Sequence, residues 1–554
     1  MPLVRAPIAT LVLLSLLTFS AGLGLKAISD GDEGYYAEAA REMVESGDWL
    51  TPHFNYADRW QKPILYYWVT AATFVVSGAS EWGARGFASA SGLGLVLLTY
   101  AVGRRLLERA DAAWLGAAIV ATCYGYFALA RLALPDLPLA LFTTLAIFLW
   151  LERRPALAGL ATALGFLDKG PLALVIPAVV LLPMAWRERW WKEPGNSPSA
   201  ISLRVGDIAR AALVFLVVAT PWYAAMVAEH GRAYLQSFFI GDNLERFATD
   251  RFNSPRGIWF YVPIVVFGTF PWTAYLLVLP WRRAVSIIRR RTSFSANEWR
   301  LIIWTLGPLI FFTMSIGKQP RYVLPVLPPL ALLLAASIVK RVRQATRGGA
   351  TDARELAVAT WVTASTCFVL AALLYRAQPV LINAHPLLTL AGVAALMGAG
   401  FSLVWTAATR RWSALPVRMA LCAVAILLTV QFGALAGSRP EAVEIVAALI
   451  RANRFGSETV ATYNSLERNL VFYTGLRQVD LFDDRQALAF LGSNERVLLV
   501  ARAEDVARLQ ATSNVPLKAL GSVEYVDPAK IRLSTLLSPL PQQHVTDVLL
   551  VTNR

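Results

Sequence analysis

Two acidic residues stand directly behind the first apolar segment and open a polar stretch. The stretch "DEGYYAEAAREMVESG" begins with Asp32 and Glu33 and continues with Tyr35 and Tyr36, and Lys62 follows in the same loop. A compact ammonium neutralises a phosphate, whereas paired carboxylates beside phenols suit a sugar. Capping a helix needs only one acidic group. The stretch therefore favours a pocket for a sugar and a phosphate over a simple helix cap.

Basic side chains recur in short loops farther along the chain, in "LDKGP", "DNLERF" and "GKQPRYVLP". A guanidinium chelates a phosphate and an ammonium neutralises one, so we expect these cations to bind an anion. The alternative is that each snorkels from a helix end to the membrane surface. The cations are Lys62, Lys169, Arg246, Lys318 and Arg321.

The elements that must position these residues are membrane-spanning helices. Of 554 residues 56% are hydrophobic and 16% charged, the mean hydropathy is +0.50, and apolar blocks recur that match a bilayer core about 30 Å thick. The segment 64–78 is interrupted and is expected to lie in the interface or re-enter it. We predict about thirteen spanning helices, near 8–25, 85–103, 112–130, 135–151, 156–168, 170–186, 208–228, 258–280, 300–316, 322–340, 356–375, 386–407 and 416–436.

The positions of the arginines and lysines predict the orientation. Because basic loops stay in the cytoplasm, the amino terminus is expected inside and every odd-numbered exit outside, with the first segment retained as an anchor. The net charge of +15 is thus mainly a topology signal, and its dispersal speaks against nucleic-acid binding. Basic residues follow every even-numbered helix: Arg104, Arg105 and Arg109; Arg153 and Arg154; Arg187, Arg189 and Lys192; Arg282, Arg283 and 289–291; 340–343; Arg410 and Arg411.

The chain divides at about Ser438 into a transmembrane domain, 1–437, and a soluble α/β domain, 438–554. The second part has an amphipathic helix at 440–453, strand-like runs "TVATY", "NLVFYTG", "RVLLVA" and "DVLLVT", and a helix near 484–492. It carries no chemical motif, so we expect a lid or docking platform on the outer side. All three cysteines lie within predicted spans, so no disulfide is indicated.

The first outer loop, about 30–84, is far the longest of the early loops. Within it the sequence predicts an interfacial helix over 34–46 that ends at Gly47. The other odd-numbered exits bring Asp136, Lys169, Arg246 and the 317–325 loop to the same face. We therefore expect one site at the level of the lipid headgroups.

Several motifs together resemble the C superfamily of membrane glycosyltransferases. They are "DEGYYAEAAREM", "GDWLTPHFN", "RWQKPILYYW", "ARLALPDLPLALF", "GFLDKGPLALVIP" and "KQPRYVLPVLPPLAL". The chain is more closely similar to the bacterial aminoarabinose transferases, which move 4-amino-4-deoxy-L-arabinose from undecaprenyl phosphate to lipid A phosphates. The resemblance covers most of 1–340 by motif. After 340 it is one of architecture, a helical domain followed by an outer α/β domain.

The resemblance implies roles for individual residues. Asp32 falls at the acceptor or catalytic centre, Asp136 at the second acidic position, and Glu33 is expected beside them. The resemblance also implies a multi-pass monomer of the bacterial inner membrane, with its site facing the periplasm. The donor phosphate is expected on Lys62, Arg246, Arg321 and Tyr322, and the substrate pocket on Tyr35, Tyr36 and Tyr66.

The implied reaction is an inverting displacement at the anomeric carbon that needs no cofactor beyond the lipid-linked donor. It would lower the negative charge of lipid A and weaken the binding of polymyxin and other cationic peptides. The residues indicate no metal site. One alternative is a related transferase that uses another polyprenyl-phosphate sugar and acts on protein or a different glycan. A lipid transporter is disfavoured because neither internal repeats nor ionisable residues near helix centres stand out.

Overall fold

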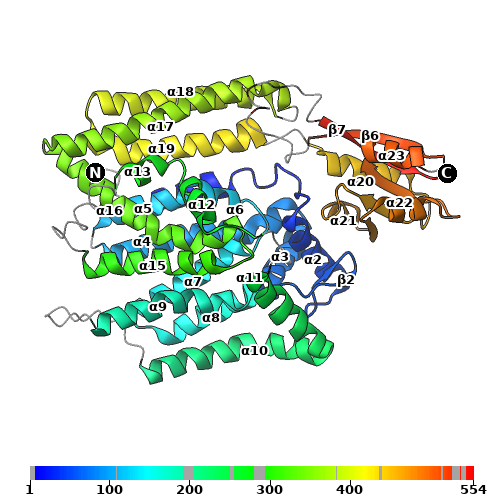
Figure 1. Ribbon diagram of the computed structural model, residues 1–554, viewed down its shortest axis with the longest axis horizontal. Helices are drawn as coiled ribbons and strands as arrows, with labels where there is room; N and C mark the ends of the chain where they lie inside the picture. The colour runs from blue at the N-terminus through cyan, green and yellow to red at the C-terminus, as the bar shows by residue number, and fades with distance from the viewer. Residues whose placement is uncertain are drawn as a thin grey trace.

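Apolar helices build most of the molecule, and a smaller α/β domain extends it along its long axis (Figure 1). The computed structural model describes residues 6–107, 109–190, 204–249, 255–279, 294–381, 384–435, 439–512, 516–526 and 545–554, together with 534, 537 and 539. The predicted boundary at Ser438 and the basic residues Lys192, Arg282, Arg283 and 289–291 lie outside these ranges.

Each segment predicted to span the membrane is helical in the structure. Many of these helices are hydrophobic on most of their surface, because they face other helices and lipid in turn. They are α1 (Pro7–Ser15) with η2 (Leu16–Ser20), α4 (Glu81–Leu106), α5 (Ala110–Ala121) with α6 (Tyr124–Ala130), α7 (Asp136–Leu151), α8 (Pro155–Lys169), α9 (Leu172–Trp190), α10 (Val205–Leu235), η4 (Ile258–Phe260) with α12 (Tyr261–Gly268) and α13 (Thr273–Val278), α15 (Ala296–Met314), η5 (Pro320–Val326) with α16 (Leu327–Thr346), α17 (Ala350–Arg376), α18 (Pro386–Ala408), and α19 (Leu415–Leu428) with η8 (Thr429–Leu435).

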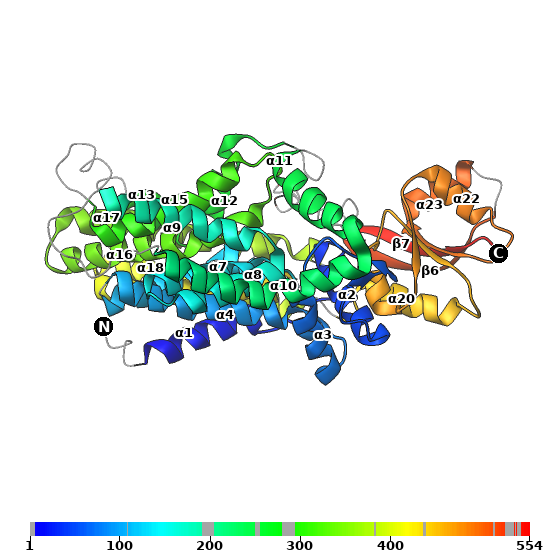
Figure 2. The same ribbon diagram turned by 90° about the horizontal axis from the view of Figure 1, so that it is seen from below.

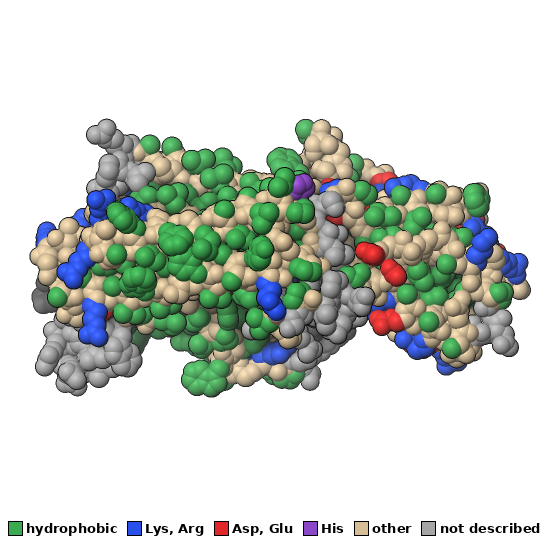
Figure 3. Space-filling view, turned by 90° about the horizontal axis from the view of Figure 1, so that it is seen from above, with side chains coloured by type: hydrophobic (Ala, Val, Ile, Leu, Met, Phe, Trp, Pro, Cys, Tyr) green, Lys and Arg blue, Asp and Glu red, His purple; other side chains and the backbone are tan. Residues whose placement is uncertain are grey.

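Within the described residues, six helices are long and apolar enough to cross a bilayer, and the pair α5 and α6, bent by 52°, makes a seventh if it forms one span. The number thirteen stays a prediction, because several of the other helices are short or broken. Figure 3 shows hydrophobic side chains covering the helical body, with one group of Lys and Arg side chains at the end away from the α/β domain and others on the α/β domain itself. That distribution fits the predicted cytoplasmic end.

The first outer loop folds into helices and a small hairpin between the helical body and the α/β domain (Figure 2). The helix α2 (Asp32–Ser46) starts two residues before the predicted one and ends as predicted at Gly47, whose φ of 72° closes it. The hairpin pairs β1 (His53–Phe54) with β2 (Ala57–Asp58). The apolar helix α3 (Leu65–Ser77), in the segment expected at the interface, packs on α2.

The carboxyl-terminal part forms a five-stranded sheet in the order β4-β3-β5-β7-β6. The strand β3 (Val460–Tyr463) is parallel to β4 (Gln478–Leu481) and β5 (Leu498–Arg502), whereas β7 (Val545–Thr552) is antiparallel to β5 and to β6 (Lys518–Val526). The helices are α20 (Ala442–Asn453), α21 (Leu470–Thr474), α22 (Asp484–Leu491) and α23 (Ala503–Thr512).

One predicted strand is wrong, because "NLVFYTG" forms the short helix α21 instead. Its consecutive residues Leu470, Val471 and Phe472 are all buried, and Gly475 ends it with a φ of 63°. A short apolar run buried on all sides has the same composition in a strand as in a helix. The run packs against α2, a partner that periodicity cannot reveal.

Candidate active site

Asp32 and Asp136 are joined by one arginine. Asp32 lies at the first turn of α2, and its carboxylate accepts from Arg321 Nη2 at 2.5 Å instead of capping its own helix. Arg321 Nε lies 3.6 Å from Asp136 Oδ1, and the same oxygen is 2.5 Å from Lys169 Nζ. Asp136 and Lys169 are buried, whereas the Asp32 side chain is 43% exposed. Asp32 is therefore the carboxylate in this row that a substrate can reach.

The charge of Asp32 is fixed by its surroundings. Burial by itself would raise the pKa of this carboxyl, but the guanidinium groups of Arg321, Arg468 and Arg59 outweigh burial and lower the pKa below its ordinary value. Asp32 is therefore ionised at neutral pH. It is suited to orient a cation or a hydroxyl and poorly suited to take up a proton.

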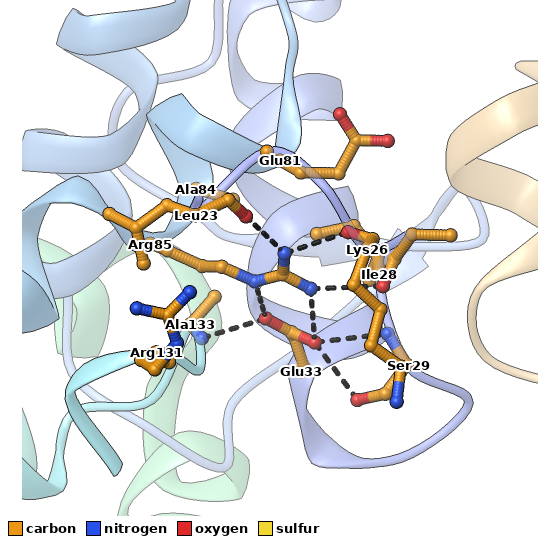
Figure 4. A network of polar contacts seen from close by, with 12 residues as sticks. Leu23, Lys26, Ile28, Ser29, Glu33, Glu81, Ala84, Arg85, Arg131 and Ala133 are labelled. Atoms are coloured by element: carbon orange, nitrogen blue, oxygen red, sulfur yellow. Dashed lines mark hydrogen bonds and ion pairs between the residues drawn. The ribbon is translucent and has the colours of Figure 1, made fainter. Parts of the chain in front are cut away.

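Glu33 has a different role from the one predicted for it. Its carboxylate forms a two-point ion pair with Arg85, at 2.7 and 3.1 Å, and accepts from the backbone N–H groups of Ser29 and Ala133 (Figure 4). The Arg85 guanidinium also donates to backbone carbonyls, among them that of Lys26 at 2.7 Å. Because both side chains are almost fully buried, this pair anchors α2 to α4, and the Glu33 carboxylate is not open to an incoming molecule.

Lys62 lies among the other predicted phosphate ligands. Its Nζ donates to the carbonyl of Gln61 at 2.7 Å. Burial, together with the nearby cations Arg246, Lys169 and Arg59, lowers the pKa of the Lys62 ammonium to about 7, while Asp242 opposes them. A phosphate brought to Lys62 would supply the anion that this ammonium lacks.

A cavity of about 310 Å³ lies beside Arg246 and Tyr322. The Arg246 guanidinium pairs with Asp242 at 2.9 Å, and the Tyr322 hydroxyl is a hydrogen-bond partner of Arg246. The remaining wall is mostly apolar and comes from α9, α15 and the π-helix η3 (Gln236–Glu245), with Arg246 in α11 (Arg246–Ala248). The apolar lining residues include Leu172, Val175, Phe239, Phe247, Phe311 and Phe312.

The three predicted pocket tyrosines differ in their positions. Tyr35 is partly exposed, 4.5 Å from the Phe54 ring and 4.0 Å from the Arg59 guanidinium. Tyr36 is buried and stacks on Tyr67. Tyr66 is fully buried and donates to a backbone carbonyl in α4. Tyr35 therefore borders the site, Tyr36 supports it from beneath, and Tyr66 belongs to the packing behind it.

Sequence reasoning missed three residues near the site: Arg59, Asp242 and Arg468. Arg59 belongs to the motif "RWQKP", three residues before Lys62. Its charge in this motif could have indicated a second cation at the site. Asp242 lies four residues before Arg246 in a helical stretch, a spacing that pairs charges. Arg468 comes from the α/β domain, and nothing in its local sequence points to Asp32.

Lys318 was expected to bind an anion with the others, but its ammonium donates to the backbone carbonyls of Ser315 and Arg256. It holds the loop before η5 in place. Within the described ranges, no group of three or more His, Cys, Asp or Glu side chains is placed to hold a metal ion.

The fold is that of the C-type membrane glycosyltransferases, which confirms the predicted fold class. ArnT from Cupriavidus metallidurans bound to undecaprenyl phosphate superposes with a TM-score of 0.71 at 19% identity, over 99% of this chain and 98% of that one. The apo oligosaccharyltransferase of Archaeoglobus fulgidus gives a TM-score of 0.51 at 12% identity, over 90% of this chain and 70% of that one.

The sequence relatives are more specific. Undecaprenyl phosphate-α-4-amino-4-deoxy-L-arabinose arabinosyl transferases from Edwardsiella ictaluri and Pseudomonas fluorescens are 31% and 34% identical over 343 residues, 59% of this chain. The chain spans 59% of the length of each of these relatives. Residues 4–234 match the dolichyl-phosphate-mannose-protein mannosyltransferase family. The resemblance that the motifs indicated is thereby confirmed.

Proposed function

We propose that the protein is an inverting glycosyltransferase that moves 4-amino-4-deoxy-L-arabinose from undecaprenyl phosphate to a lipid A phosphate. The sequence relatives carry this activity in their names. The observation that carries the proposal is the apolar cavity with Arg246 and Tyr322 on its wall and Lys62 nearby. An anionic lipid fits such a place, because the tail meets the apolar wall and the phosphate meets the cations.

The donor phosphate is the leaving group in this reaction. The bond between the anomeric carbon and the donor phosphate oxygen breaks, and its electron pair stays on undecaprenyl phosphate. Lys62 and Arg246, both partly buried, stabilise the charge that develops there. An oxygen of the acceptor phosphate forms the new bond from the opposite face, which inverts the anomeric centre.

The acceptor phosphate is already anionic at neutral pH, so the reaction needs no strong base. This agrees with the lowered pKa of the Asp32 carboxyl. Asp32 then orients the acceptor or pairs with the ammonium of the sugar, and Arg321 holds Asp32 in place from η5. Asp136, which pairs with Lys169, lies behind Arg321.

The proposed setting is the inner membrane of a bacterium, with the site at the periplasmic surface and the α/β domain outside. The donor, the acceptor and the surrounding lipids are then the partners, and the chain acts as a monomer. Less negative lipid A binds cationic peptides more weakly.

The test is a transfer assay with purified protein, undecaprenyl phosphate-aminoarabinose and lipid A. Mass spectrometry is expected to find lipid A heavier by one aminopentose. Lys62→Ala is expected to abolish transfer while the protein still unfolds cooperatively. A hexose on lipid A, or label on protein alone, would overturn the proposal.

A second candidate is a transferase that glycosylates protein from another polyprenyl-phosphate sugar. The match of residues 4–234 to protein mannosyltransferases favours it. That acceptor is a hydroxyl, so a base would have to take its proton. The low pKa of Asp32 makes this residue a weak base. Supplying a polyprenyl-phosphate hexose and a membrane-protein fraction in the same assay separates the two reactions.

A further inference from the structure

The α/β domain places Arg468 at the candidate site. Arg468 lies between β3 and α21, in a turn whose residues Asn464 and Leu466 have positive φ. Its backbone N–H donates to Asp30 Oδ1 at 2.8 Å. Its carbonyl oxygen lies so close to α2 that a Cβ on Gly34 would come within 2.3 Å of it. The backbone of Arg468 makes the contacts with α2 and Asp30, so these contacts do not depend on its side chain.

The Arg468 side chain joins a group of cations around Asp32. Its guanidinium carbon is 5.3 Å from the centre of the Tyr35 ring, and the Arg59 guanidinium carbon is 4.0 Å from the same ring. Both arginines act electrostatically on Asp32, as does Arg321. Arg468 is half-buried, as are Tyr35 and Arg59, so an incoming molecule can reach these groups.

Acidic groups also face Arg468, from both elements packed against it. Asp30 accepts a hydrogen bond from the backbone N–H of Arg468. Asp480 accepts from Thr462 in the neighbouring strand at 3.1 Å. Burial and the nearby carboxylates of Asp30 and Asp480 raise the pKa of Glu467. The guanidinium of Arg468 therefore lies among several carboxylates, including that of Asp32.

We propose that Arg468 and Arg59 bind the phosphate of the acceptor lipid, in a subsite that the α/β domain completes. This rests on the proposed function. The cations assigned to the donor, Lys62 and Arg246, lie around Asp242, and Arg246 lines the cavity for the tail. Arg59 acts electrostatically on both Lys62 and Asp32, whereas Arg468 acts on Asp32. The two arginines meet instead at Tyr35, where α2 lies against the α/β domain (Figure 2). Two phosphates that react through one sugar need separate sets of cations.

The decisive variant is Arg468→Gln, because its backbone keeps the docking contacts. With bisphosphorylated lipid A and undecaprenyl phosphate-aminoarabinose as probes, the KM for lipid A should rise about tenfold or more, the cost of one charge-assisted hydrogen bond. The KM for the donor should stay within about twofold. Arg468→Lys should recover part of the loss. The matched control is Arg485→Gln, in the exposed part of α22 in the same domain, which should leave both constants unchanged.

A second pair of variants moves Arg468 without removing a charge. In Gly34→Ala the new methyl group meets the Arg468 carbonyl and pushes the turn away, so the KM for lipid A should rise here too. Gly31→Ala is the control, because a Cβ there meets nothing within 4 Å. If Gly34→Ala does not fold, Arg468→Gln decides alone.

Two results would overturn the inference: an unchanged KM for lipid A in Arg468→Gln, or a rise confined to the donor. The second would assign Arg468 to the donor phosphate. Neither would touch the proposed function, which fails only if the wild-type protein transfers no aminopentose to lipid A.

Discussion

At the scale of single residues, Asp32 and Glu33 are neighbours in the chain with different environments. The Asp32 side chain is 43% exposed and pairs with Arg321 near the surface. Glu33 is buried with Arg85, and five hydrogen bonds satisfy its carboxylate. The first residue is free to serve a substrate, whereas the second holds the helix that carries the first.

Substitution should separate these two roles. Asp32→Asn should abolish transfer and change stability by about 1 kcal/mol or less, because exposed ion pairs contribute little. Glu33→Gln should cost about 3 kcal/mol, because it leaves the Arg85 charge buried and unpaired. Thermal unfolding in detergent, run beside the transfer assay, measures both. Equal losses of stability in the two variants would contradict the separation.

Lys62 should make donor binding depend on pH. Its pKa of about 7 means that the ammonium is charged below this value and neutral above it. A bound phosphate favours the charged form and raises the pKa in the complex. Donor affinity should thus be full below pH 7 and fall by up to about tenfold per pH unit above it.

The measurement is the KM for the donor between about pH 6 and 9, where the donor phosphodiester keeps one constant charge. Lys62→Arg is the control, because a guanidinium stays charged throughout this range. A flat profile in the wild-type protein would show that the ammonium is charged at all these values.

At the scale of elements, the position of Arg246, a proposed phosphate ligand, depends on how α10 packs against α8. A Cβ on Gly159 in α8 would come within 2.2 Å of the Ala211 carbonyl oxygen in α10. The helix α10 then turns at Gly231, where φ is 62°, and leads into η3 with Asp242 and on to Arg246. A shift of α10 therefore reaches the donor site.

Gly159→Ala should accordingly lower stability by about 1–3 kcal/mol through overpacking and raise the KM for the donor. Gly206→Ala, in the partner helix α10, is the matched control, since a Cβ there meets nothing within 4 Å. Thermal unfolding and donor kinetics report the two effects. A normal donor KM in Gly159→Ala would mean that the donor site does not follow α10.

The sequence predicted the helices well because apolar composition alone decides what enters a bilayer. It did not predict breaks such as the one between α5 and α6, where the apolar run continues through the bend. The sequence also predicted that Asp32, Asp136, Lys169 and Arg321 lie together, because the predicted topology places their loops on the same side of the membrane. The sequence could not show which of these charged residues face a substrate and which form buried ion pairs. The buried partner of Glu33 is Arg85, which lies 52 residues away in another helix.

At the scale of the whole molecule, the predicted orientation can be tested with single cysteines. Cys123, Cys367 and Cys422 are buried, so the background of labelling is low. Asn494→Cys, exposed in the α/β domain, should react with a membrane-impermeant maleimide added from the periplasmic side. Thr351→Cys, exposed at the start of α17, should react only after the membrane is opened. The reverse pattern would invert the orientation.

The contact between Arg468 and Asp30 joins residues 438 positions apart. Synthesis and export deliver Asp30 long before Arg468. A chain still being made has its donor ligands long before it has the turn that docks on α2. If Arg468 holds the acceptor, each new molecule stays inactive until the α/β domain has crossed the membrane and folded. Incomplete chains would then bind the lipid-linked donor without transferring its sugar.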